Sequence, residues 1–277
     1  MGESGPLPTL QDMSPVPRPT AAFFDLDKTI IAKSSTLAFS REFQAGGLIS
    51  RGAVLRSAYA QFVYLVGGAD HDQMEKMRQF MSQLVAGWHV QTVRDIVADT
   101  LHNIVDPLVY DEAVSLIEEH HLAGRDVIIV STSGSEVVEP IGLMLGADKV
   151  IATRMDVEDG KYTGKIQFYA YAENKAAAIR DLAGKRGYDL SGSYAYSDSV
   201  TDVHMLEAVG HPHAVNPDRD LRRIARERDW PVLVFDKPVA LRSRVPTRPT
   251  LAVLAVGGAV AVGGLVWASA RRKRLGA

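Results

Sequence analysis

Short apolar runs, each closed by polar residues, alternate along the chain with longer segments in which apolar residues recur every three or four positions. Runs of this kind are typical of buried parallel strands, and the longer segments indicate helices. Strands are predicted at 21–24, 126–130, 149–152, 193–196, 214–215 and 232–235, and helices at 136–145, 175–186, 200–209 and 218–228. A hairpin is predicted to turn at Asp159-Gly160, and His211-Pro212-His213 is predicted as a loop before a strand. Strands that alternate with helices predict an α/β fold with a Rossmann-like, mainly parallel sheet.

The segment between the first two predicted strands is too long for an ordinary crossover helix. It shows helical periodicity throughout, with Gly46-Gly47 and Gly67-Gly68 as interruptions. We therefore expect a helical cap at 36–109, inserted into a catalytic core formed by 20–35 and 110–240.

The two ends of the chain differ from this core in composition. Residues 1–19 are rich in proline and predict a disordered tail. After a linker at 241–250, residues 251–270 are uncharged, and as a helix they would reach about 30 Å, the thickness of a bilayer core. Trp267 lies near one end, and the basic tail 271–277 follows. These features predict a single-pass C-terminal transmembrane helix, and the lack of an export signal favours a cytoplasmic catalytic domain.

The amino-acid composition excludes several kinds of functional site. The 277 residues contain no cysteine, which excludes disulfides, thiolate nucleophiles and cysteine-based metal sites. Because the formal net charge is −2, no overall basic field would attract nucleic acid.

Polar side chains that could do chemistry follow the predicted strands directly. Carboxylates, hydroxyls and one lysine fall at strand ends or helix starts: Asp25, Asp27, Thr29, Ser131, Lys175, Asp198 and Asp202. The carboxyl ends of parallel strands meet at one edge of a sheet, where open α/β sheets bind ligands. Clustered carboxylates repel unless a cation neutralises them, and Mg²⁺ with a substrate phosphate would do so. The inventory therefore points to phosphoryl transfer with a metal ion.

Taken in order, these segments resemble the four motifs of the haloacid dehalogenase (HAD) superfamily. The motifs are Asp25-Leu26-Asp27-Lys28-Thr29, Val-Ile-Ile-Val-Ser131, Asn174-Lys175 and Ser197-Asp198-Ser199-Val200-Thr201-Asp202. A helical cap after the first motif is similar to subfamily IB, the phosphoserine-phosphatase-like branch. The resemblance covers about residues 20–236.

The resemblance implies a mechanism and a role for each matching position. Asp25 would be the nucleophile that forms an aspartyl-phosphate, and Asp27 would protonate the leaving oxygen and then deprotonate water. Phosphate contacts would come from Thr29, Ser131, Thr132 and Lys175. The implied cofactor is Mg²⁺, held by Asp25, the backbone carbonyl of Asp27, Asp198 and, directly or through water, Asp202.

Other positions depart from the phosphoserine phosphatase pattern. Thr132-Ser133 replaces Gly-Gly, Ser34 replaces an acidic residue that meets the substrate ammonium, and Ser197 and Thr201 replace a glycine and an asparagine. These departures leave the catalytic core in place but put recognition of phosphoserine in question.

The sequence therefore predicts a Mg²⁺-dependent phosphomonoesterase whose partners are a small phosphomonoester and a membrane. The substrate could be phosphoserine-like, a lipid-related phosphate or a soluble metabolite. A phosphotransferase with the same intermediate, and a membrane-tethered regulator that binds phosphorylated ligands without turnover, remain alternatives.

Overall fold

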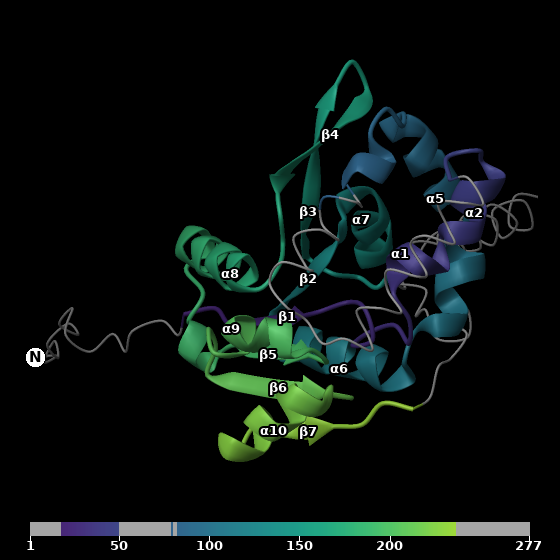
Figure 1. The fold of residues 1–277 in the computed structure, drawn as a ribbon. Helices are drawn as coiled ribbons and strands as arrows, with labels where there is room; N and C mark the ends of the chain where they lie inside the picture. The colour runs from purple at the N-terminus through teal and green to yellow at the C-terminus, as the bar shows by residue number, and fades with distance from the viewer. Residues whose placement is uncertain (1–17, 50–78, 80–81, 237–277) are drawn as a thin grey trace, which may run out of the picture. The chain divides into compact units, whose positions relative to one another are not determined.

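The computed structural model describes residues 18–49, 79 and 82–236 (Figure 1). Several predicted segments lie outside the described residues: the N-terminal tail up to residue 17, residues 50–78 and 80–81 of the predicted cap, the linker 241–250, the helix predicted at 251–270 and the basic tail 271–277. Within the described ranges, no helix combines the length and the apolar character needed to cross a membrane.

A seven-stranded sheet forms the centre of the described unit (Figure 1). Six strands are parallel, and β4 pairs antiparallel with β3. In spatial order the strands are β4 (Lys161–Phe168), β3 (Lys149–Glu158), β2 (Asp126–Gly134), β1 (Ala21–Phe24), β5 (Tyr194–Ser197), β6 (His211–Val215) and β7 (Val232–Leu233). All four side chains of β1 are fully buried, as expected for a central strand covered on both faces.

Alternate residues of the central strands point to opposite faces, and each face is covered by helices. One face packs Phe23 and Ile128 with α8 (Glu173–Arg186), α9 (Val203–Leu206) and α10 (Arg219–Glu227). Against β2 lie α6 (Asp111–Leu122) and α7 (Ser135–Met144). Short 3-10 helices lie at η2 (Asp106–Leu108), η3 (Leu190–Gly192) and η4 (Val200–Asp202).

The segment predicted as the cap begins and ends on two adjacent stretches of backbone. Ile31 and Val109 form an antiparallel bridge, and the N–H of Tyr110 donates to the carbonyl of Ile30 at 2.9 Å. Between these points the described helices include α1 (Ser35–Ala38), α2 (Ser40–Ala45) and α5 (Val90–Val105).

The hairpin of β3 and β4 is hydrogen-bonded to residues of the predicted cap. Its turn residues Asp159 and Gly160 both have positive φ angles, 48° and 74°, as a two-residue primed turn requires. The Gly160 carbonyl accepts a hydrogen bond from the N–H of Val90 at 3.0 Å, and Tyr162 exchanges backbone hydrogen bonds with Gly87 and Trp88. The hairpin predicted from Asp159-Gly160 is thus present.

Two local predictions were wrong. His211-Pro212-His213 is not a loop but the first part of β6. Proline is tolerated there because β7 pairs only with Ala214 and Val215, so no ladder hydrogen bond is needed from Pro212. The helix predicted at 200–209 is instead the short η4 followed by the four-residue α9.

Candidate active site

The turn after β1 places two carboxylates at the carboxyl edge of the sheet. The backbone N–H of Asp25 donates to the carbonyl of Tyr196 on β5 at 2.9 Å, which fixes the start of the turn. The Leu26 carbonyl then accepts hydrogen bonds from three successive N–H groups, those of Thr29, Ile30 and Ile31. Asp25 is therefore held rigidly between the ends of β1 and β5.

Lys175 joins two of the predicted carboxylates. Its Nζ lies 2.7 Å from Oδ1 of Asp25 and 2.8 Å from Oδ2 of Asp202, and only 1% of the lysine is exposed. The lysine lies in the first turn of α8, just after Ala172, whose φ of 47° is unusual for a residue other than glycine. These ion pairs bring together residues from three distant segments of the sequence.

Burial and charge change the ionisation of this group. The pKa of Asp25 is raised to about 8, chiefly by burial and in part by the nearby carboxylates of Asp202, Asp198 and Asp27, against the lowering effect of Lys175. Burial alone would lower the pKa of Lys175, but the carboxylates of Asp202 and Asp25 outweigh it and hold that pKa above its usual range. The lysine therefore stays charged, and one positive charge leaves the carboxylates only partly neutralised.

Asp198 lies at the end of β5 and is 9% exposed. Burial raises its pKa to about 7, the Lys28 ammonium lowers it, and the Asp202 and Asp218 carboxylates raise it. Lys28 has a φ of 63°, in the left-handed region that side-chain-bearing residues rarely adopt. This exposed lysine is thus a second cation that acts on the cluster, and nothing in the sequence pattern pointed to it.

The predicted phosphate contacts occupy different environments. Ser131, 1% exposed in the second half of β2, accepts a hydrogen bond from the N–H of Ser133 at 3.2 Å. The Thr29 hydroxyl donates to Oδ2 of Asp25 at 3.3 Å. The hydroxyl of Thr132 instead donates to the carbonyl of Ala170 at 2.9 Å, which ties β2 to the segment before α8. The role of Thr132 in binding phosphate stays a prediction.

Both oxygens of the Asp27 carboxylate are engaged. Oδ1 accepts a hydrogen bond from the N–H of Ser35 at 2.7 Å, and Oδ2 accepts one from the Ser133 hydroxyl at 2.9 Å. From the sequence, Ser133 was recognised only as a departure from the phosphoserine phosphatase pattern. Ser197 was noted in the same way, and its hydroxyl donates to Oδ2 of Asp202 at 2.7 Å.

The donor set is compatible with a magnesium ion, although the described part of the chain holds no cluster of three or more Asp, Glu, His or Cys side chains arranged as a metal site. Mg²⁺ commonly takes only one or two protein carboxylates and completes its shell with water and substrate oxygens. Asp25 and Asp198 fit this requirement, since burial raises the pKa of both carboxyl groups and a divalent cation bound beside them would favour their charged forms. Asp202 is directed to Lys175 and Ser197 through Oδ2.

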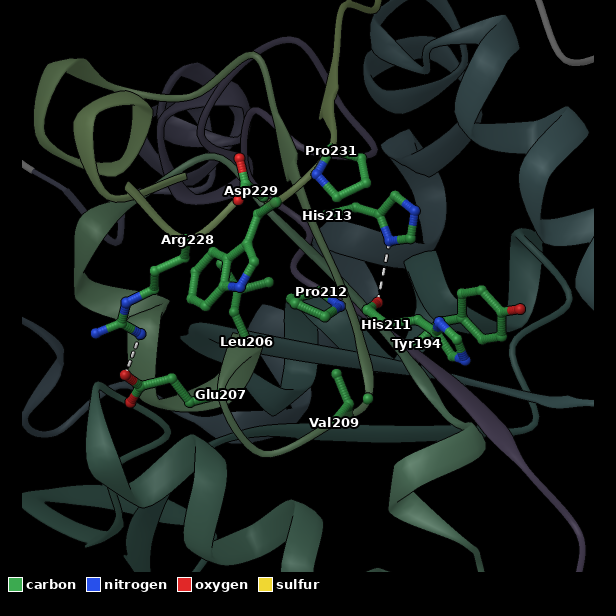
Figure 2. Close-up of a pocket in the computed structure, with 12 residues that line it drawn as sticks. Tyr194, Leu206, Glu207, Val209, His211, Pro212, His213, Arg228, Asp229 and Pro231 are labelled. Atoms are coloured by element: carbon green, nitrogen blue, oxygen red, sulfur yellow. Dashed lines mark hydrogen bonds and ion pairs between the residues drawn. The ribbon is translucent and has the colours of Figure 1, made fainter. Parts of the chain in front are cut away.

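A separate cavity of about 560 Å³ lies at the start of β6 and contains none of the predicted site residues (Figure 2). Its lining includes Tyr194, His211, Arg228 and Trp230. Arg228 pairs with Glu207, and a ring nitrogen of His213 lies 3.0 Å from the carbonyl of His211. The predicted chemistry therefore belongs to the carboxyl edge of the sheet and not to this cavity.

Comparison with known proteins agrees with the motifs. A model of the haloacid dehalogenase-like hydrolase family matches residues 22–207. The chain is similar, at 66% identity over 92% of its length and 94% of the relative's, to an "inhibition of morphological differentiation protein" of Streptomyces azureus.

Two relatives from Mycobacterium tuberculosis carry names that state an activity. A probable phosphatase is 60% identical, over 89% of this chain and 85% of the relative. A phosphoserine phosphatase is 31% identical, over 89% of this chain and 80% of the relative. The resemblance found in the sequence motifs is thereby confirmed. The chain belongs to the haloacid dehalogenase-like hydrolase family and is a phosphatase of its phosphoserine-phosphatase-like branch.

Proposed function

We propose that this phosphatase is a Mg²⁺-dependent phosphomonoesterase that works through an aspartyl-phosphate on Asp25. The observation that carries the proposal is the contact between buried Asp25 and buried Lys175, 2.7 Å apart, at the carboxyl edge of the sheet. In its deprotonated form, Asp25 can attack an electrophilic phosphorus. The charged ammonium of Lys175 attracts the phosphoryl oxygens at the same time.

The proton transfers and the phosphate contacts are assigned to other residues of the chain. Asp27 gives a proton to the leaving oxygen as the bond between phosphorus and that oxygen breaks. It then takes a proton from the water that attacks the phosphorus and frees Asp25. Ser131 and Lys175 hold oxygens of the transferring group, and Thr29 supports Asp25 through the hydrogen bond from its hydroxyl.

The proposed metal ligands are the carboxylates of Asp25 and Asp198 and the backbone carbonyl of Asp27, with Asp202 assisting. When bound, Mg²⁺ supplies positive charge that offsets the carboxylates and the substrate phosphate. The burial that raises the pKa of Asp25 and Asp198 supports this assignment, since a bound cation would offset the cost of ionising both carboxyl groups there.

The substrate is proposed to be a small phosphomonoester, either phosphoserine-like or carrying a lipid-related phosphate. Relatives include a phosphoserine phosphatase, which favours the first. Ser34 stands where phosphoserine phosphatases are expected to have an acidic residue for the substrate ammonium, which favours an ester without that group.

We also propose that residues 251–270 anchor the enzyme to a membrane with the catalytic domain in the cytoplasm. The uncharged stretch, Trp267 near its end and the following Arg271-Arg272-Lys273-Arg274 support this location. Membrane fractionation of the full chain, compared with a chain that ends at Asp236, tests it. Equal recovery of both in the soluble fraction would contradict the anchor.

The catalytic proposal is tested by screening the full chain against a panel of phosphomonoesters with and without Mg²⁺. We expect phosphate release that requires the metal and is abolished in Asp25→Asn. Added alcohols that divert the phosphoryl group to a new ester would favour a phosphotransferase. A phosphorylated ligand that stays bound without being consumed would favour a regulator.

A further inference from the structure

Ser133 lies at the centre of a network of hydroxyl groups beside the catalytic turn. Its hydroxyl donates to Oδ2 of Asp27 at 2.9 Å and accepts a hydrogen bond from the Ser35 hydroxyl at 2.9 Å. The Thr36 hydroxyl lies 3.2 Å from the same oxygen. Ser133 is 9% exposed and Ser35 is fully buried, so water does not readily replace these partners.

These contacts match what a serine hydroxyl can make. A hydroxyl has one proton to donate and two lone pairs that accept. The proton of Ser133 goes to Asp27, one lone pair accepts from Ser35, and the other faces Thr36. In such a chain each hydrogen bond polarises the next, so the final donation to the carboxylate is strengthened.

The network holds Asp27 in one orientation. The N–H of Ser35 binds Oδ1 at 2.7 Å while Ser133 binds Oδ2, so rotation of the carboxylate would break at least one of these bonds. A group that moves a proton must meet its partner atom within hydrogen-bond reach, and orientation of that group contributes to the rate.

The same hydroxyls connect the carboxylate to the cap. Ser35 and Thr36 are the first residues of α1, immediately after the point where the chain leaves the core. Ser133 comes from the end of β2, about a hundred positions further along the sequence. The first turn of the cap is therefore linked to the carboxylate in two ways, directly through the N–H of Ser35 and indirectly through Ser133, which comes from a distant part of the sequence.

From this geometry we infer that Ser133 is a positioning residue, whose hydroxyl fixes the Asp27 carboxylate for proton transfer and couples it to the first turn of the cap through Ser35. The inference rests on the proposed function, since it assigns Asp27 the proton transfer. It gives a role to a position at which the family pattern has glycine.

The test compares two aryl phosphates that differ in how much they need a proton donor. p-Nitrophenolate leaves without protonation, whereas phenolate, a poorer leaving group, depends on it. In Ser133→Ala we expect kcat/KM for phenyl phosphate to fall about tenfold, part of the roughly 10²–10⁴-fold effect of general acid catalysis. For p-nitrophenyl phosphate the fall should stay below about threefold, because protonation contributes little to that reaction.

Ser135→Ala is the matched control. Ser135 is 8% exposed, lies two residues away, and donates its hydroxyl to Glu136 at 3.1 Å instead of to the catalytic turn. The ratio of the two kcat/KM values should be unchanged in this variant. Ser133→Thr, which keeps a hydroxyl, should recover part of the lost ratio, and Ser35→Ala should shift the ratio in the same direction as Ser133→Ala but less.

The possible outcomes distinguish failure of the inference from failure of the proposed function. Equal losses on both substrates in Ser133→Ala, or no loss, would overturn the inference while leaving the proposed function intact. A wild-type chain that releases no phosphate from either substrate with Mg²⁺ would overturn the proposed function, and the inference with it.

Discussion

Replacing Lys175 with methionine removes the cation that two buried carboxylates share. Methionine keeps most of the aliphatic length of lysine, so the change deletes charge and hydrogen bonds more than volume. The partners left behind are Oδ1 of Asp25 and Oδ2 of Asp202, which lie 2.7 and 2.8 Å from the lysine nitrogen. With the lysine 1% exposed, water cannot take its place without local opening.

The expected cost follows from this burial. Removing one partner of a buried ion pair destabilises proteins by about 3–5 kcal/mol, because the other charge is left uncompensated. Protonation of Asp25 relieves part of the cost, since the pKa of this carboxyl is already raised to about 8 and the loss of Lys175 raises it further. Relief by protonation is available at low pH and is lost as pH rises.

The assay is urea unfolding of the metal-free protein at two pH values. For Lys175→Met we expect the free energy of unfolding to fall by about 3 kcal/mol or more at about pH 8.5, and by less at about pH 5.5. Lys185→Met is the matched control on the same helix. The Lys185 nitrogen lies 2.6 Å from Asp181, but the two side chains are 71% and 61% exposed. Such a pair is worth about 0–1 kcal/mol, so this variant should lose little. A loss below about 1 kcal/mol in Lys175→Met at the higher pH would refute the argument from burial.

Three further predictions concern ionisation. Burial raises the folded-state pKa of Asp25 to about 8 and that of Asp198 to about 7, both from 3.8, so the folded protein binds more protons than the unfolded chain between these values. Stability without metal should therefore fall as pH rises from about 4 to 8, by up to about 1.4 kcal/mol per pH unit for each group, and urea unfolding across that range measures it. Mg²⁺ should stabilise the protein more at about pH 8 than at about pH 5, because it binds the deprotonated carboxylates; equal shifts in melting temperature at both would contradict the assigned ligands. The pKa of His120 is lowered from 6.5 to about 4, chiefly by burial and in part by the Arg125 guanidinium. Its ring should therefore stay neutral as pH is lowered to about 5, which NMR would measure. Its contribution to stability should be lost as pH falls from about 6.5 toward 4.

Sequence reasoning found the parts of the fold that local pattern determines. The fully apolar run 21–24 forms β1, and the alternation of strands and helices gives the α/β sheet. Because parallel strands end at one edge, placing Asp25 and Asp198 after strands was enough to predict that they would meet there.

Pairings between distant side chains were not predictable in the same way. Lys175 was expected near Asp25, but its equally short contact with Asp202 depends on how η4 follows β5. The hydroxyl of Ser133 reaches Asp27 only because the end of β2 lies beside the first turn of the cap. The proline in β6 misled the prediction for 211–213, since its tolerance depends on where β7 stops pairing.

The central claim is that Asp25 carries the phosphoryl group between two half-reactions. Acid quenching of the full chain during turnover of an aryl phosphate, followed by mass spectrometry of its peptides, tests it directly. The account predicts one added phosphoryl group on the peptide that contains Asp25, and no such adduct in Asp25→Asn. An adduct on another residue, or rapid turnover that persists in Asp25→Asn, would contradict it.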